Sequence, residues 1–191
     1  MYPNKKRYDT RNEKCLFVVS VEGAATEVEY LERLGKIYYD TCIIDILSDV
    51  NKSSPNSVLD RIKKYRCSLK KGDELWCVID KDKWTDAQLD AIVDWSQEQM
   101  AGGVSRNLGL SNPKIELWLL FHFVEWKPGE AIVAKLFKVM PDYDKHLDVA
   151  NITKVAVEDA IRRAKALSPD CSPPRTKVGT NLWVLAEHIK G

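Results

Sequence analysis

The chain contains 191 residues, 45% of them hydrophobic, which is the size and composition of one ordinary globular domain with at most a modest appendage. Basic and acidic side chains number 29 and 28, so the net charge of +1 neither requires nor excludes a nucleic-acid partner. No apolar stretch reaches the ~18 residues needed to span a bilayer, and the polar N-terminus lacks the apolar centre of a secretory signal, so we expect a cytoplasmic protein that does not enter a membrane.

The first elements of the chain are a basic arm, a strand and a helix. Residues 1–14 are polar and rich in lysine and arginine, and we expect them to form a flexible arm. The apolar run at 15–21 predicts a buried strand. Thr26 with Glu29 three residues later resembles a capping box, which predicts a helix that ends near Gly35.

Two further strand–helix units follow. The apolar run at 42–47 predicts a strand, and Ser54-Pro55 is typical of the start of a helix, here one that stops at Gly72. The run at 74–79 predicts a third strand, and Thr85 is expected to cap the helix behind it. The first of these helices is expected to have an apolar face formed by Val58, Ile62, Tyr65 and Leu69.

The remaining segments complete a core and a helical extension. Residues 104–110 predict a weaker fourth strand, and Asn112-Pro113 precedes a strongly apolar helix at 115–123 that we expect to be buried against the sheet. Residues 15–125 would form the core, and residues 126–191 a helical C-terminal extension packed on it within a single domain overall. The helices of this extension are expected near 129–139, 153–167 and 180–190.

Strands that alternate with helices predict an α/β fold with a mostly parallel, four-stranded sheet flanked by helices. In the common strand order 2-1-3-4, the first and third strands are neighbours at the switch point where ligands bind. Glu22 follows the first strand, and Asp80 and Asp82 follow the third, so these carboxylates are expected at one crevice. If residues 80–82 stay extended, both aspartates point to the same side. Because clustered carboxylates repel one another unless a cation offsets their charge, we predict an Mg²⁺ or Mn²⁺ site there.

Three segments of the chain resemble a known family. A glutamate after the first strand and an Asp-x-Asp after the third are similar to the Toprim domain of topoisomerases, primases and related nucleases. With the third segment, they resemble the RloB-like family, Toprim-type proteins of bacterial antiphage and restriction-linked loci, over roughly residues 12–190. The segments are Val21-Glu22-Gly23 with Thr26-Glu27, Ile79-Asp80-Lys81-Asp82, and Ser111 to Phe123, SNPKIELWLLFHF.

The resemblance implies a Toprim-like (Rossmann-like) core and roles for the acidic residues. It makes Glu22 a general acid/base or a metal ligand, and Asp80 and Asp82 the metal-binding pair. It places Glu116, together with Asn112, near the same site. A favourable interaction with the helix dipole explains Glu116 equally well, and the same explanation is preferred for Glu27.

Basic side chains are candidates for contacts with the phosphates of DNA or RNA. Several crowd one predicted helix, where a solvated surface is the alternative explanation, and others lie near the later motif and the Pro-rich stretch before the last helix. The candidates are Lys63, Lys64, Arg66, Lys114, Arg175 and Lys177.

These features predict a metal-dependent nuclease in bacterial antiphage defence, and the resemblance implies an ATPase partner of the ABC/SMC type. Asp80 and Asp82 would hold the cation, while Glu22 would hold a second ion or move a proton. Because no Ser, Cys or Tyr is placed as an obvious nucleophile, direct attack by water is expected. Two alternatives are a catalytically silent Toprim scaffold and a nucleotide-binding or receiver-like α/β domain that acts as an interaction subunit. The substrate, the trigger and assembly into a homo-oligomer are left open.

Overall fold

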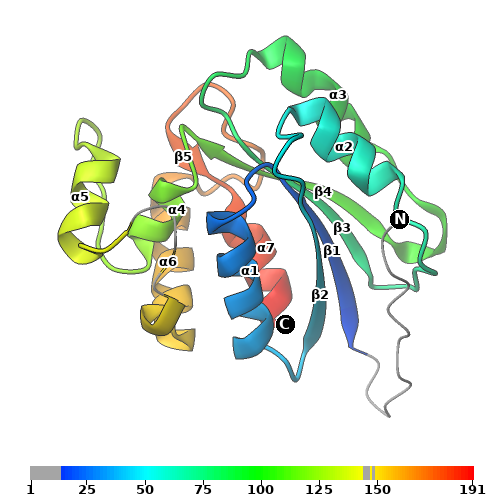
Figure 1. The fold of residues 1–191 in the computed structure, drawn as a ribbon, viewed down its shortest axis with the longest axis horizontal. Coiled ribbons are helices and arrows are strands. Elements are labelled where there is room, and N and C mark those ends of the chain that lie inside the picture. Colours follow the sequence, from blue (N-terminus) through cyan, green and yellow to red (C-terminus); the bar gives the residue numbers. More distant parts are fainter. Residues whose placement is uncertain (1–13, 144–146, 148) are drawn as a thin grey trace.

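The structure is a computed structural model that describes residues 14–143, 147 and 149–191 (Figure 1). All of the expected N-terminal arm except Lys14 lies outside the described residues. The described chain is an α/β fold in which helices cover both faces of a five-stranded sheet. None of its helices is long and apolar enough to cross a membrane.

The sheet has the strand order β2-β1-β3-β4-β5, and the first four strands are parallel, as predicted. Val21 at the end of β1 lies opposite Val78 near the end of β3, so both strands finish at the same edge. The parallel strands are β1 (Cys15–Val21), β2 (Cys42–Leu47), β3 (Glu74–Asp80) and β4 (Ser105–Asn112).

The prediction of a four-stranded sheet is wrong by one short strand. β5 (Gly179–Thr180) pairs antiparallel with Ser111 and Asn112 at the end of β4. It has two residues, which is too short for an alternating pattern to be visible in a sequence. The last helix therefore begins at Leu182 rather than at residue 180.

Helices cover the sheet unequally (Figure 1). Two pack on one face, four contribute to the other, and a further helix stands at the periphery beyond α4. On the first face are α2 (Pro55–Lys63) and α3 (Asp86–Gln97), with the short 3₁₀ turn Ala101–Gly103 before β4. On the second are α1 (Thr26–Ile37), α4 (Glu116–Phe121), α6 (Lys154–Leu167) and α7 (Leu182–Lys190), with the 3₁₀ turn Val149–Asn151, and the peripheral helix is α5 (Ile132–Val139).

Alternation along the strands sorts the apolar side chains into two cores. Phe17 and Val19 of β1 face the core under α1 and α7, while Leu16 and Val18 face the core under α2 and α3. α7 comes so close to β4 that a Cβ on Gly109 would lie 2.6 Å from a methyl carbon of the α7 leucine, Leu182. Close packing on both faces fixes the strand ends, where the functional side chains lie.

The predicted capping box at the start of α1 is not formed. The N-cap is Ala25, whose side chain makes no capping hydrogen bond, and Thr26 is already the first helical residue. Glu29 instead accepts a hydrogen bond from the backbone N–H of Leu147 in the C-terminal extension. Glu29 therefore makes a tertiary contact in place of the capping hydrogen bond that the sequence predicted.

α2 ends at Lys63, well before the predicted stop at Gly72. After the helix, the Tyr65 hydroxyl donates to Asp45 Oδ2 on β2 at 2.9 Å, and Leu69 packs against the core beneath α2 and α3. Tyr65 and Leu69 therefore keep the apolar spacing of a helix, although the segment that contains them, after Lys63, is not helical.

Candidate functional site

The carboxyl ends of β1 and β3 bring two of the predicted acidic residues together. Glu22 directly follows β1, and Asp80 is the last residue of β3. The Asp80 backbone N–H donates to Glu22 Oε2 at 3.3 Å, and the Glu22 N–H donates to the carbonyl oxygen of Val78 at 3.1 Å. Parallel pairing of neighbouring strands is sufficient to produce this convergence.

Two more carboxylates reach the same place from helix starts. Glu27 lies in the first turn of α1 and Glu116 in the first turn of α4. Both repel the Asp80 carboxylate strongly enough to raise its pKa, as Glu22 also does. We name Glu22, Glu27, Asp80 and Glu116 the carboxylate cluster.

Burial is the main cause of the raised pKa values of three carboxyl groups in this cluster. It raises the pKa of Glu22, Glu27 and Asp80 above their ordinary values, that of Asp80 by a large margin. Hydrogen bonds act in the opposite direction: the Ile115 N–H donates to Asp80 Oδ1 at 2.8 Å and favours the ionised form. Burial and mutual repulsion outweigh these bonds, so the pKa values of Glu22, Glu27 and Asp80 stay raised and these three groups retain protons to higher pH than isolated carboxyl groups.

Glu27 occupies its position because a glycine lies beside it. The Gly23 N–H donates to Glu27 Oε1 at 3.1 Å, and a Cβ at residue 23 would come within 2.1 Å of Glu27 Oε2. Only glycine lets the carboxylate lie this close to the backbone. The sequence alone favours a helix-dipole role for Glu27. The glycine four residues before it was the feature that could have indicated a place in the site.

Glu116 has an oxygen without a partner. Tyr143 donates its hydroxyl to Glu116 Oε1 at 3.2 Å. Oε2 is buried and, among the described residues, accepts no hydrogen bond. Leaving a buried acceptor unsatisfied costs ~1–3 kcal/mol, and more when it is charged.

Asp82 does not join the cluster, because the prediction that residues 80–82 stay extended is wrong. The Trp84 N–H donates to the Lys81 carbonyl oxygen at 2.8 Å, which marks a turn directly after β3. The Asp82 side chain is 44% exposed, and its Oδ2 lies 3.5 Å from Lys114 Nζ. Asp82 and Lys114 therefore form a surface ion pair at the mouth of the site.

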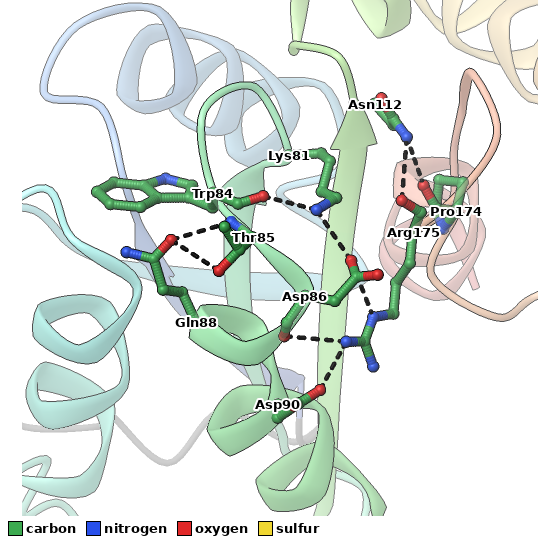
Figure 2. Close-up of polar contacts among 9 residues, drawn as sticks. All are labelled: Lys81, Trp84, Thr85, Asp86, Gln88, Asp90, Asn112, Pro174 and Arg175. Atoms are coloured by element: carbon green, nitrogen blue, oxygen red, sulfur yellow. Dashed lines mark hydrogen bonds and ion pairs between the residues drawn. The ribbon is translucent and has the colours of Figure 1, made fainter.

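The turn after β3 places an indole against Glu22. Trp84 Nε1 donates to both oxygens of the Glu22 carboxylate, at 3.1 and 3.2 Å. Lys81 holds the turn, since its Nζ donates to the Trp84 carbonyl oxygen at 2.6 Å and lies 2.9 Å from Asp86 Oδ1 (Figure 2). Thr85 caps α3 as predicted, with its N–H donating to Gln88 Oε1 at 3.0 Å. Sequence reasoning missed Trp84.

Arg175 ties the loop before β5 to the start of α3 (Figure 2). Its guanidinium donates to the Asp86 carbonyl oxygen at 2.9 Å and to Asp90 Oδ1 at 2.6 Å. The Asn112 amide holds the same loop by donating to the Pro174 carbonyl oxygen at 3.0 Å. Both predicted site residues thus anchor a loop at the edge of the sheet.

The other basic candidates lie at two different edges of the molecule. Lys114 and Lys177 are exposed near the cluster and near β5, respectively. Lys63, Lys64 and Arg66 are exposed at the end of α2 that leads to the start of β3, which is the edge opposite the carboxylates. The two sets of basic side chains that are separate in the sequence therefore lie at opposite edges of the sheet.

Arg61 belongs to neither basic group, because it is buried under the end of β1. It donates to Ser20 Oγ at 3.3 Å, to the Lys52 carbonyl oxygen at 2.6 Å and to the carbonyl oxygen of Val21. These bonds fix the backbone immediately before Glu22.

His122 is a buried core residue. Its Nδ1 lies 3.0 Å from the Trp118 carbonyl oxygen, and its Nε2 lies 3.2 Å from the Tyr30 hydroxyl. Since the carbonyl only accepts, Nδ1 carries the proton and Nε2 accepts from Tyr30. Burial lowers the pKa of His122 to about 4, so the ring is neutral at pH 7.

The cluster suits a divalent cation in charge and donor type without being a preformed ligand shell. In the part of the chain that the structure describes, no three His, Cys, Asp or Glu side chains are arranged to hold a metal ion as they stand. Nor does any of the four carboxylates form an ion pair with a described lysine or arginine. The unpartnered Glu116 oxygen and the repulsion that Asp80 receives from Glu27, Glu116 and Glu22 are features that a hard, oxygen-preferring cation would offset.

Comparison with known proteins gives one family. The model of the RloB-like protein family matches residues 17–189, a range that contains the whole carboxylate cluster. No curated protein and no solved structure matches the chain. Because the match extends over most of its length, the chain belongs to the RloB-like protein family.

Proposed function

We propose that this protein hydrolyses phosphodiester bonds of nucleic acid at the carboxylate cluster, with Mg²⁺ or Mn²⁺ as its cofactor. The supporting observation is the convergence of four partly or fully buried carboxylates at the carboxyl edge of the sheet, where none of them forms an ion pair within 4 Å with a described lysine or arginine and Lys83 acts only weakly on the pKa of Glu22. This edge is the usual ligand site of open α/β sheets. Neither helix capping nor core packing requires such a concentration of negative charge.

Asp80 and Glu22 are the residues best placed to hold the cation, together with the unpartnered Oε2 of Glu116. When bound, the cation would polarise a phosphoryl oxygen and stabilise the charge that develops on it. Asp82 could contribute an oxygen only by leaving its ion pair with Lys114. Of the acidic residues predicted from the sequence, the proposal therefore uses Glu22, Asp80 and Glu116 and leaves Asp82 in its ion pair, while Glu27 joins the cluster through its charge next to Asp80.

Glu22 is suited to moving a proton in this reaction. Its carboxylate is oriented from two sides, by the Trp84 indole and the Asp80 N–H. Burial raises its pKa, which brings it closer to the pH at which a general acid/base works best. Glu22 would accept the proton of an attacking water or supply one to the departing oxygen.

The hydroxyl of Tyr143 forms a hydrogen bond with the carboxylate cluster, but this hydroxyl is poorly suited to be a nucleophile. Burial raises its pKa, and its proton is donated to Glu116. A neutral phenol held in this way positions Glu116. Direct attack by water therefore remains the preferred route.

Cleavage of labelled nucleic acids tests the proposal. The purified protein is incubated with single-stranded and duplex DNA and RNA, with Mn²⁺, with Mg²⁺ and with EDTA. We expect metal-dependent cleavage that Asp80→Asn abolishes and that the exposed-surface control Asp94→Asn retains. Equal activity of parent and Asp80→Asn, or none with any substrate or metal, would favour the catalytically silent scaffold.

The family resemblance supports a role in antiphage defence together with an ABC/SMC-type ATPase. A protein of this kind would need an assembly surface besides its hydrolytic site. Co-expression with an ATPase encoded beside it, followed by tag-based purification, tests this part of the proposal. We expect a stoichiometric complex that also forms with Asp80→Asn, and separate elution of the two proteins would count against the partnership.

A further inference from the structure

A groove lies beside the carboxylate cluster, between the start of α4 and the start of α5. Its volume of about 460 Å³ falls within the ~300–1,000 Å³ of typical small-ligand sites. Pro113, Lys114 and Glu116 line one side, and residues 131–134 line the other. In Figure 1, α5 stands at the periphery of the molecule, beyond α4.

Most of the groove surface is apolar. Ile132, Val133 and Val178 line it, and the last two are 43% and 42% exposed, which is high for large aliphatic side chains. Trp126 lines it as well, and its Nε1 donates to the Glu130 carbonyl oxygen at 2.9 Å, which fixes the indole ring. The groove therefore presents open aliphatic side chains to solvent, whereas Trp126 is only 9% exposed and belongs to the core.

The groove is continuous with the proposed hydrolytic site. Glu116 lines the groove and belongs to the carboxylate cluster. Lys114 on the rim keeps 46% of its side chain exposed beside Asp82, and the exposed Lys177 is the neighbour of Val178. A phosphate at the cluster would thus have ammonium groups nearby and an apolar recess on one side.

We infer that this groove receives an unpaired base adjacent to the phosphate being cleaved, so that the substrate is single-stranded nucleic acid. The inference rests on the proposed function. A base inside a duplex has both faces covered by its stacked neighbours, whereas an unpaired base can place a face against the exposed aliphatic side chains of the groove, Val133 and Val178. The exposed ammonium groups of Lys114, which pairs with Asp82, and of Lys177 would meet the phosphates of such a strand beside the acidic end of the groove.

Filling the groove provides the test. Ala134 is exposed and lines the groove, so Ala134→Trp should occupy the space without disturbing the core. Ala91→Trp is the matched control, since Ala91 is an exposed alanine on α3, over the other face of the sheet. Val133→Trp is a second groove variant in case Ala134→Trp lowers the melting temperature.

Each protein is given a single strand, the matching duplex and an abasic strand of the same length. With Mn²⁺, the parent and Ala91→Trp should cleave the base-bearing single strand ~10-fold or more faster than the duplex and the abasic strand. The groove variants should lose this preference and cleave the abasic strand at the parent's rate. A preference that survives both groove variants, or equal cleavage of duplex and single strand, overturns the inference while hydrolysis stands.

If the parent cleaves nothing, the proposed function fails, and a binding measurement decides about the groove separately. Fluorescence anisotropy with labelled strands compares Asp80→Asn with Asp80→Asn/Ala134→Trp. Tighter binding of the base-bearing strand than the abasic strand, lost on filling the groove, supports the inference. Equal affinities for the two strands overturn it.

Discussion

At the scale of single residues, Glu22 is held by contacts from three parts of the chain. The Trp84 indole and the Asp80 N–H bind its carboxylate, and Arg61 fixes the backbone before it through Ser20 and Val21. A residue needed only for solubility would not require this support. Holding a carboxylate in one orientation is what proton transfer demands.

Glu22→Gln keeps the shape of the side chain but removes its charge and its ability to move a proton. We expect metal-dependent cleavage to fall by ~10²–10⁴-fold, the range typical of losing a general acid/base. The circular dichroism spectrum should match that of the parent, and the melting temperature should not fall below that of the parent, because a charge is removed from the cluster. Cleavage within a few-fold of the parent would assign proton transfer to another group.

Trp84→Phe removes the indole donor and keeps an aromatic ring. Because that hydrogen bond lowers the pKa of Glu22, its loss should raise the pKa further. If Glu22 acts as a base, the acidic limb of the pH–rate profile should move to higher pH, with a reduced rate at pH 7. A purely structural role for Trp84 would lower the rate equally at all pH values.

Part of this site could be predicted from the sequence. Glu22 and Asp80 stand directly after apolar runs that end at one edge of a parallel sheet, so topology alone predicts that they meet. Trp84 was not predictable, because its contact with Glu22 depends on a turn held by Lys81 and Asp86. The place of Glu27 in the site was only partly predictable, because its contact with Gly23 can be inferred only when the start of the helix is known.

At the scale of elements, the site is built where short connections follow long, buried strands. The turn after β3 and the segment before α4 are joined by a backbone contact, from the Asp82 N–H to the Pro113 carbonyl oxygen at 2.9 Å. Arg175 and Asn112 attach the loop before β5 to α3 and β4. Residues from the predicted core and the predicted extension therefore share one edge of the sheet.

Because the basic residues lie at two separate edges of the sheet, the salt dependence of nucleic-acid binding should differ between variants at the two edges. If nucleic acid follows the carboxylate edge, the Lys114→Gln/Lys177→Gln double variant should reduce the slope of log affinity against log salt by about two, one per lost phosphate contact. The Lys63→Gln/Lys64→Gln/Arg66→Gln variant reports whether the strand also reaches the opposite edge. Unchanged slopes in both variants would exclude all five side chains from phosphate binding.

Periodicity predicted the existence and order of the elements better than their ends. Apolar runs and caps located β1 to β4 and α3, whereas the contact of Glu29 with Leu147 and of Tyr65 with Asp45 changed the start of α1 and the end of α2. Such contacts join residues far apart in sequence, which local patterns do not contain. β5 escaped prediction because two residues show no period.

At the scale of the whole molecule, the fold holds a concentration of negative charge that works against its own stability. The pKa values of Glu22, Glu27 and Asp80 are raised above the ordinary 4.5, 4.5 and 3.8. The folded state therefore binds protons more tightly than the unfolded state. This contribution to stability is fully present below pH ~4 and is lost as the pH rises through the raised values.

Denaturation with urea in EDTA between pH 4 and pH 8 tests this linkage. Asp80→Asn removes one charge, so its free energy of unfolding relative to the parent should increase with pH, by about 1 kcal/mol or more over this range. Taking the difference between variant and parent cancels the titration of groups away from the cluster. A difference that stays constant with pH would show that the cluster is not under electrostatic strain.

The most direct test of the account is the effect of Mn²⁺ on thermal unfolding, because it requires no knowledge of the substrate. A cation that binds only the folded cluster should raise the melting temperature of the parent by roughly 5–10 °C at ~100-fold excess over its dissociation constant. Asp80→Asn should melt higher than the parent in EDTA and show no such rise, while Asp94→Asn should behave as the parent. An equal Mn²⁺ response in parent and Asp80→Asn would contradict a cation site at the carboxylate cluster.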